Sequence, residues 1–424
     1  MTRLSFAEYM DQTLYGPQGY YASGAAASGR AGDYFTAPDV SPVFGRLLAA
    51  IWMRWANEFA ARPFHLVEMG AGEGHLARAI GAAIQKDHRE QLGRLNYIAV
   101  ERSPTRCRSL ELLESSMPCP FRVLPDLSSL KASPLTGCFF ANELIDAFPV
   151  HRVRNHQGRL QEAYVEQTAS GKRLVWTDPS TSCLEAYFAR IGIRLSPTRH
   201  PPQLLAGDLS SHGMMDSRPE TAGNDGVRVE ESWLPEGYET EINLAMGEWI
   251  RSVAASLSSG LVALIDYGRP AHEYYHPERS RGTLRGFIRH AVRSDVLSDE
   301  IMDMTADVDF TSLALDAQEA GLCPLAYMDM GSFLMTSARF LWENRLSFPA
   351  GSGGESIPNA KMDLLPVTAG DDGVGREWAG LRYLVHPEGL GSAFQVLVLG
   401  KGLDPRDWLF EGNRLSRLGL TNHD

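Results

Sequence analysis

FHLVEMGAGEGHLARAI, residues 64–80, joins a short apolar run to three glycines at alternate positions and then to a helical pattern. The run FHLV is typical of a buried strand in a parallel sheet, and HLARAIGAAI repeats its apolar residues at helical spacing. Glycines between two such elements indicate a sharp bend of the backbone or a ligand lying against it. The segment therefore predicts a strand, a tight turn and a helix, and a simple connection is the alternative to a ligand site.

The spacing of the glycines distinguishes between classes of nucleotide site. Gly70, Gly72 and Gly74 form G-x-G-x-G, whereas a dinucleotide fingerprint would place its third glycine where His75 stands. The segment holds no G-x-x-x-x-G-K-S/T phosphate loop, so hydrolysis of ATP or GTP is unsupported. Glu68 precedes the glycines, and a carboxylate there would repel phosphates but attract a cationic group. The loop favours a cationic nucleoside without phosphates, and S-adenosylmethionine (SAM) is the main candidate cofactor.

Two further acids follow apolar runs. Leu95 to Pro104 read as a second strand ending at Glu101, where a carboxylate can accept both ribose hydroxyls of either NAD or SAM. A solvated acid beside Arg102 is the alternative. Asp126 follows a third apolar run, FRVL, and could reach an adenine amino group.

Strand-like runs alternate with helical patterns, which predicts an α/β fold with a mostly parallel, doubly wound seven-stranded sheet. After the three runs above, the remaining strands are FFAN, GLVALIDYG, LCPLAYMDM and AFQVLVLGKG. More than a hundred residues separate FFAN from GLVALIDYG, too many for one crossover. We therefore expect an inserted cap over the carboxyl ends of the strands, with a hairpin around Ser170 and Gly171 and an amphipathic helix over ETEINLAMGEWIRSVAASL.

The expected segments are an N-terminal helical and lid segment (1–60), the first half of the SAM-binding core (61–150), the inserted cap (151–256) and the second half of the core (257–424). Residues 196–226 of the cap are rich in Pro, Gly, Ser and charge, so we expect a flexible surface loop there. The segment before the first strand contains many glycines and the aromatics Tyr20, Tyr21, Tyr34 and Phe35. We interpret it as a lid that shields the reaction from water.

The fourth strand leads into NELIDAFPVHR, which places Asn142, Glu143 and Asp146 where open α/β sheets bind their ligands. Methyl transfer from a sulfonium is an in-line displacement that depends mainly on positioning. If the acceptor is a guanidinium, paired carboxylates can grip its fork of N–H groups. The alternative is that Asn142 and Glu143 simply begin a helix.

Composition excludes several classes. The net charge of −12 argues against a nucleic-acid partner, and no apolar run of 18 residues predicts a membrane span. Five scattered cysteines without a C-x-x-C pair suit a reducing compartment and give no zinc site, so no metal is expected. The N-terminus resembles neither a signal nor a transit peptide, so we expect a cytoplasmic protein, or a mitochondrial matrix protein only if a transit peptide has been removed.

The chain resembles the MidA-like family of class I SAM-dependent methyltransferases, which includes the mitochondrial complex I assembly-factor methyltransferase and bacterial relatives. The shared segments run over nearly the whole chain: GYY, GDYFTAPDVSPVFG, EMGAGEGHLA, VERSP, ANELIDAFPVH, LIDYG, GTLRGFIRH, DMTADVDF and GLGSAFQVLVLGKG. The resemblance implies a Rossmann-like fold with an N-terminal lid and an inserted cap. It also implies a protein arginine methyltransferase acting on a subunit of respiratory complex I.

We assign three groups of site residues. The catalytic group on the acceptor side is Asn142, Glu143 and Asp146. The cofactor-binding group is Glu68, Gly70, Gly72, Gly74, Glu101, Asp126 and Thr36. The substrate-binding group is Tyr20, His151, Asp266 and Tyr267. Asp309 and Phe310 match a family motif of unassigned role, and Asp307 replaces a histidine that is usual in the family.

Three functions remain open. The first is methyl transfer from SAM to arginine on a protein substrate. The second is an O- or N-methyltransferase for a small-molecule acceptor, and the third is an assembly chaperone that binds SAM without essential catalysis. A homodimer is one option for the oligomeric state.

Overall fold

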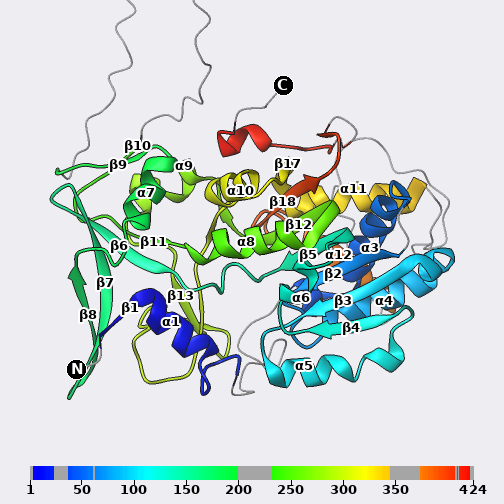
Figure 1. Cartoon of the computed structure of the whole chain (residues 1–424), viewed down its shortest axis with the longest axis horizontal. Helices are drawn as coiled ribbons and strands as arrows, with labels where there is room; N and C mark the ends of the chain where they lie inside the picture. The colour runs from blue at the N-terminus through cyan, green and yellow to red at the C-terminus, as the bar shows by residue number, and fades with distance from the viewer. Residues whose placement is uncertain are drawn as a thin grey trace, which may run out of the picture.

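The computed structural model describes residues 3–22, 37–60, 63–198, 232–343, 373–405, 408 and 410–420. Thr36, Tyr34 and Phe35, together with residues 199–226 of the expected loop, lie outside the described residues. Figure 1 shows two neighbouring regions, with strands β2 to β4 in its right half and strands β6 to β8 at its left.

The main sheet contains all seven strands that the sequence predicts for the doubly wound core. Its members are β2 (Phe64–Met69), β3 (Leu95–Val100), β4 (Phe121–Leu124), β5 (Leu135–Asn142), β12 (Leu257–Arg269), β17 (Cys323–Asp329) and β18 (Phe394–Lys401). Their order is β17-β18-β12-β5-β2-β3-β4, and the two-residue β16 (Val308–Asp309) pairs with β12 as an eighth strand. Only β18 runs antiparallel to its neighbours in this sheet, so the mostly parallel prediction is confirmed. The strand order reverses between β2 and β5, which is where open α/β sheets bind ligands.

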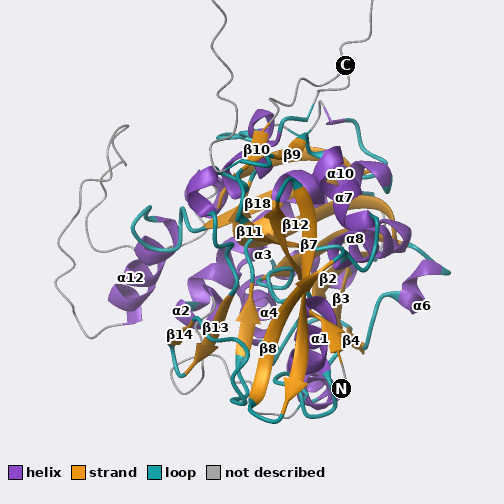
Figure 2. Ribbon diagram, turned by 90° about the vertical axis from the view of Figure 1, so that its left-hand side faces the viewer, coloured by secondary structure: helices purple, strands orange, loops and turns teal. Residues whose placement is uncertain are grey.

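Helices cover both faces of the main sheet, as a doubly wound fold requires, and Figure 2 shows the strands running between them. One face carries α3 (Pro42–Asn57), α4 (His75–Asp87), α5 (Pro104–Glu111), α11 (Met330–Glu343) and α12 (Gly373–Val385). The other carries α6 (Ser128–Lys131), α8 (Ala245–Ser256) and α10 (Phe310–Glu319). The alternating strand residues separate into these two cores: Leu66 packs on the first face and Val67 on the second.

A second sheet forms most of the cap. It consists of β1 (Arg3–Ser5), β6 (His151–His156), β7 (Arg159–Thr168), β8 (Gly171–Thr177) and β11 (Glu239–Ile242). The hairpin expected around Ser170 and Gly171 joins β7 to β8. Helix α1 (Phe6–Tyr15) packs on this sheet and on a third one made of β13 (Arg285–Ile288), β14 (Ala291–Arg293) and β15 (Asp303–Thr305). The remaining short elements are α2 (Ala37–Val40), α7 (Cys183–Arg190), β9 (Ile193–Leu195), β10 (Ser232–Leu234) and α9 (Ala271–Tyr274).

The spatial grouping differs from the expected segments in two places. Within 1–60, β1 joins the cap sheet whereas α3 packs against the main sheet, and residues 285–305 of the expected second core half lie with α1. The helix expected from Glu239 begins only at Ala245, because residues 239–242 pair with β6 as a strand. In the part of the chain that the structure describes, no helix is long and apolar enough to cross a membrane.

Candidate active site

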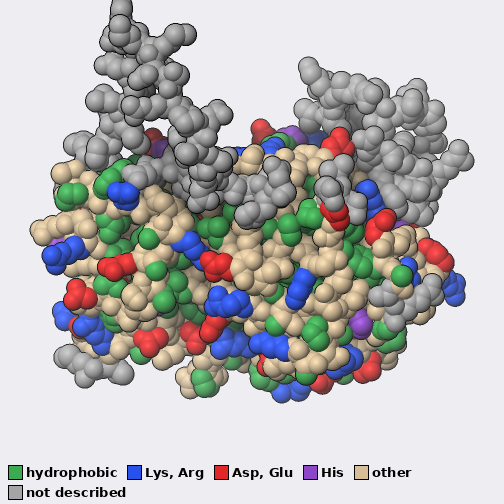
Figure 3. Space-filling view, turned by 45° about the horizontal axis from the view of Figure 1, so that its top comes forward, with side chains coloured by type: hydrophobic (Ala, Val, Ile, Leu, Met, Phe, Trp, Pro, Cys, Tyr) green, Lys and Arg blue, Asp and Glu red, His purple; other side chains and the backbone are tan. Residues whose placement is uncertain are grey.

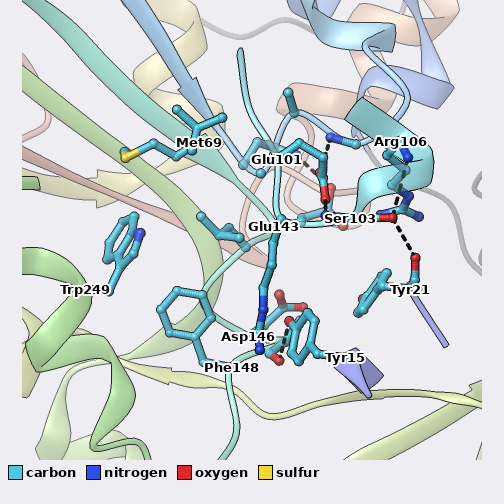
Figure 4. Close-up of a pocket in the computed structure, with 18 of the residues that line it drawn as sticks. Tyr15, Tyr21, Met69, Glu101, Ser103, Arg106, Glu143, Asp146, Phe148 and Trp249 are labelled. Carbon is cyan, nitrogen blue, oxygen red and sulfur yellow. Dashed lines mark hydrogen bonds between the residues drawn. The ribbon is translucent and has the colours of Figure 1, made fainter. Parts of the chain in front are cut away.

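A cavity of about 1460 Å³ lies at the carboxyl ends of the central strands and includes residues that follow β2, β3, β4 and β5. Nine of the thirteen described site residues assigned from the sequence line it: Glu68, Gly70, Gly72, Glu101, Asp126, Asn142, Glu143, Asp146 and Tyr267. Gly74 follows the lining residue Glu73 but does not line the cavity itself. Figure 4 shows Glu143 between two parts of this wall, with Glu101 and Ser103 above it and Tyr15, Asp146 and Phe148 below it.

The cofactor loop, residues 70–74, bends through three left-handed glycines. The φ angles are +73° at Gly70, +57° at Gly72 and +76° at Gly74, a region that L-residues rarely adopt. A Cβ atom at Gly70 would lie 2.8 Å from Leu144 Cδ1, and one at Gly74 would lie 2.4 Å from Leu113 Cδ1. A Cβ at Gly72 would meet nothing within 4 Å. Gly70 and Gly74 thus permit close packing, whereas Gly72 keeps open a space that a ligand can fill.

Glu101 ties the cofactor loop to the strand beside it. Its Oε2 accepts the backbone N–H of Gly72 at 2.9 Å, and its Oε1 accepts that of Ser103 at 2.8 Å. Each carboxylate oxygen has a further lone pair, so these bonds are compatible with a ribose diol as an additional donor. Asp126 lies at the exposed rim, where hydrogen bonds from Ser128 lower its pKa. The ribose and adenine roles of these two acids stay predictions.

Glu68 differs from the ionised acid expected beside the glycines. Its side chain is buried, and its Oε2 accepts a hydrogen bond from the Tyr97 hydroxyl at 2.5 Å. Burial raises the pKa of Glu68 to about 8, although the Tyr97 hydrogen bond acts in the opposite direction. Burial thus shifts Glu68 toward its uncharged form, whereas the sequence suggested an anion beside the glycines.

The acceptor turn, residues 143–146, follows β5 and contains the strained residue of the site. Glu143 adopts φ +52°, which costs a non-glycine residue about 1–2 kcal/mol. Its Oε1 accepts hydrogen bonds from Asn142 Nδ2 at 3.0 Å and from the backbone N–H of Ala37 at 3.1 Å. No helix follows Asn142, so the helix-start alternative is wrong. The start of α2 therefore contacts the acid assigned to the acceptor side.

Asp146 and Asp266 lie behind Glu143 and are both buried. Burial, together with the charges of Asp266, Glu143 and Asp303, raises the pKa of Asp146 well above its usual range. Burial also raises the pKa of Asp266 to about 7, against four backbone N–H groups that favour its charged form. Asp146 lines the cavity, but Asp266 is not among its lining residues.

Tyr267 and Arg285 close the same end of the cavity. The Tyr267 ring lies 3.9 Å from the Phe394 ring between centroids, and burial raises the pKa of its hydroxyl. Arg285 forms an ion pair with Asp307. Arg285 lines the cavity together with Asp146 and Asp303, and its charge lowers the pKa of Asp146, against the larger effects of burial and neighbouring acids that raise it.

Two assigned substrate residues lie away from the cavity. Tyr20 is buried in the core around α1, and His151 on β6 pairs with buried Glu162 on β7 at 2.7 Å. Tyr21, which the sequence reasoning placed only in the lid, lines the wall. Four further lining residues were missed by the sequence reasoning: Tyr15, Phe148, Trp249 and Arg285. The Tyr15 and Tyr21 rings stack with centroids 5.3 Å apart, and the Tyr21 hydroxyl donates to Asp303 at 2.7 Å. The neighbouring GYY segment was the available signal, but only the fold shows which tyrosine faces inward.

The motif containing Asp309 has a structural explanation. Asp309 Oδ1 accepts the backbone N–H groups of Thr311 and Ser312 at the start of α10, and its Oδ2 accepts the Tyr187 hydroxyl at 2.9 Å. This carboxylate caps α10 and joins it to α7, outside the cavity.

The residues present fit SAM. The space open at Gly72 and the carboxylate of Glu101 can hold a nucleoside, and Asn142, Glu143 and Asp146 line the same cavity. Asn142 Oδ1 is a buried atom without a hydrogen-bond partner among the described residues, as expected where a ligand supplies the donor.

Comparison with known proteins agrees with this geometry. Residues 43–328 match a family described as "Putative S-adenosyl-L-methionine-dependent methyltransferase". The chain is 24% identical to the protein arginine methyltransferase NDUFAF7, mitochondrial, of Mus musculus, covering 93% of this chain and 80% of the relative. It is 25% identical to the Drosophila melanogaster homolog of that protein, covering 74% and 67%.

A crystal structure of a Burkholderia thailandensis protein bound to S-adenosyl-homocysteine shares the fold. Its TM-score is 0.71 at 24% identity, with 97% of this chain and 92% of that chain covered. The family match covers about two thirds of the chain, and SAM is the family's cofactor. The chain belongs to this family of S-adenosylmethionine-dependent methyltransferases.

Proposed function

We propose that this methyltransferase transfers methyl groups to the guanidinium group of arginine in a protein substrate. The observation that carries the proposal is the cluster of acids at this end of the cavity, where Glu143, Asp146 and Asp303 line the wall and burial, together with the charges of Glu143 and Asp303, raises the pKa of Asp146. A cationic guanidinium would offset the mutual repulsion of these acids. The NDUFAF7 relatives, which are named protein arginine methyltransferases, support the same acceptor.

The roles of the residues follow from the chemistry of the reaction. Bound SAM supplies an electrophilic methyl group on a sulfonium. Glu143 and Asn142 would hold N–H groups of the acceptor, so that a nitrogen lone pair is aimed at the methyl group. The attacking nitrogen loses one proton for each methyl group gained, and an ionised Glu143 can take it. The aromatic residues Tyr15, Phe148 and Tyr267 would exclude water from this end.

The mitochondrial names of the relatives make a subunit of a respiratory complex our proposed protein substrate. Incubation of the purified chain with labelled SAM and a cell extract, followed by mass spectrometry of peptides, would identify the acceptor. Label on arginine supports the proposal. Label confined to small molecules would replace it with a metabolite methyltransferase.

Glu143→Gln tests the acceptor role in the same assay. Glutamine retains the size of the side chain but lacks the negative charge, so we expect arginine methylation to fall about 100-fold or more while S-adenosyl-homocysteine affinity stays within about threefold. Rescue of a deletion strain by this variant would instead favour the chaperone function. Equal loss of binding and turnover would assign Glu143 to the cofactor.

A further inference from the structure

We infer that Asp266 is a positioning residue that holds the acceptor turn in its reactive shape from beneath. This inference goes beyond the proposed function, because it concerns the turn itself whatever acceptor enters. Asp266 Oδ2 accepts the backbone N–H groups of Leu144, Ile145 and Asp146 at 3.2, 2.8 and 3.3 Å. Its Oδ1 accepts the N–H of Tyr267 at 2.9 Å. One carboxylate at the end of β12 thus binds the backbone of three consecutive residues of the turn.

The turn needs such support because it begins in strained backbone. Glu143 is left-handed at φ +52°, and such strain persists only where the surroundings enforce it. The N–H of Glu143 donates to Ile265 O at 3.0 Å, directly before Asp266. Ile265 and Asp266 of strand β12 therefore accept hydrogen bonds from four successive backbone N–H groups, those of residues 143 to 146. Their donation to one strand end fixes the direction in which the Glu143 and Asp146 side chains leave the backbone.

The same turn contacts the cofactor loop. A Cβ at Gly70 would lie 2.8 Å from Leu144 Cδ1, so Leu144 packs directly against the glycine. Through this contact, the height of the turn above the sheet also sets the distance between the acceptor acids and the cofactor loop. A small displacement at such a site is costly, because a 1 Å misplacement of reacting groups can reduce the rate about 100-fold.

A second contact holds the turn from the cap side. Asn243 Nδ2 donates to Ile145 O at 3.3 Å, while Asn243 Oδ1 accepts the N–H of Met246 at the start of α8. The turn is therefore held on its N–H side by Asp266 and on its C=O side by Asn243. This arrangement offers two independent substitutions that act on one turn.

Asp266→Asn is the main test, with Asp309→Asn as its matched control. Both acids are buried and cap backbone N–H groups, but Asp309 caps α10 outside the cavity. The asparagine in Asp266→Asn has only one oxygen that can accept hydrogen bonds. Its NH₂ group must therefore face either the N–H of Tyr267 or the three N–H groups of the turn, and the hydrogen bonds on that side are lost. We expect about 10-fold faster hydrogen exchange at residues 144–146, and S-adenosyl-homocysteine affinity within about threefold of wild type because Asp266 lies outside the cavity.

Turnover of an arginine peptide that the wild type methylates should fall about 100-fold in kcat in Asp266→Asn, with little change in KM for SAM. Asp309→Asn should lower the Tm but leave exchange at residues 144–146 and kcat near wild type. The inference is overturned if Asp266→Asn folds with unchanged exchange and kcat, or if the two variants lose kcat equally.

If Asp266→Asn does not fold, the variant Asn243→Asp tests the same inference. The aspartate keeps the side-chain oxygen that accepts the N–H of Met246 at the start of α8, but it lacks the N–H group that Asn243 donates to Ile145 O. Faster exchange at residues 144–146 with a smaller loss of kcat supports the inference, and unchanged exchange overturns it. If the wild type methylates no arginine peptide, the arginine proposal fails, whereas exchange and S-adenosyl-homocysteine binding still decide the role of Asp266.

Discussion

The cofactor loop and the acceptor turn follow neighbouring parallel strands, and both depend on left-handed backbone. The loop uses glycines at Gly70, Gly72 and Gly74, whereas the turn places Glu143 at φ +52°. The loop needs the absence of side chains, because space for the ligand stays open at Gly72. Under the proposed function the turn also needs a carboxylate at the strained position, which a glycine would not supply.

The two regions also differ in how their shape is maintained. Glycine adopts its φ angles without steric cost. The loop is held by donations from Gly70 and Ala71 to Val100 O, from Gly72 to Glu101 and from Gly74 to Ala71 O. The acceptor turn is held by the end of β12 through Ile265 O and Asp266. A binding loop can thus be specified locally, whereas a strained acid requires support from a strand 120 residues further along the chain. On the face drawn in Figure 3, hydrophobic and charged side chains are mixed.

Glu143→Gly is the strongest test of the difference between a glycine and an acid in left-handed backbone. Glycine removes the strain of about 1–2 kcal/mol but also the acceptor for Ala37 and Asn142 N–H groups, so we expect the free energy of unfolding to stay within about 1 kcal/mol. Turnover should fall about 1000-fold, because the acceptor acid is lost. Thermal unfolding and kcat measure the two effects. Retained turnover would show that only the backbone shape at this position matters.

Gly72→Val should affect the cofactor end alone. A valine there is strained at φ +57° and fills the open space, so we expect affinity for S-adenosyl-homocysteine to fall at least about 100-fold. Gly171→Val is the matched control, since Gly171 also has a positive φ and open surroundings but lies in the β7–β8 hairpin. Calorimetric titration should show near wild-type affinity for the control. Equal loss in both variants would indicate general unfolding.

Glu68→Gln should change how stability depends on pH. The pKa of Glu68 is raised from 4.5 to about 8 on folding, so the folded state binds this proton more tightly and stability falls as the pH rises from about 4.5 toward 8. Glutamine can still accept the Tyr97 hydrogen bond but does not titrate. The variant should match wild type near pH 5 and exceed its Tm near pH 9. Glu111→Gln on the exposed face of α5 should show no such divergence, and a constant offset for Glu68→Gln would contradict the assigned cause.

Asp126→Asn should have the smallest effect. Asp126 is exposed at the cavity rim, and loss of one charged acceptor there should weaken S-adenosyl-homocysteine binding about threefold to tenfold. Titration at fixed ionic strength measures the change. A loss above about 100-fold would place this acid at the centre of the nucleoside site.

Local pattern predicted the strands of the main sheet and nine residues of the cavity wall. Alternation and apolar runs identified all seven principal strands, and polar residues at strand ends such as Glu101 and Asn142 face the cavity because parallel strands share one edge. Predictions within the cap were weaker. The helix expected from Glu239 gave way to β11, because pairing with β6 outweighs the helical pattern of an isolated segment.

The sequence by itself determined the α/β class, the glycine loop and the acids at the strand ends, since each depends on residues close together in the chain. Only the tertiary structure decided that Tyr15 and Tyr21 face the cavity while Tyr20 is buried, that Asp266 binds the acceptor turn, and that burial raises the pKa of Glu68. Burial and contacts between distant segments set these properties. They depend on which surfaces meet after folding, and no local spacing of residues specifies that.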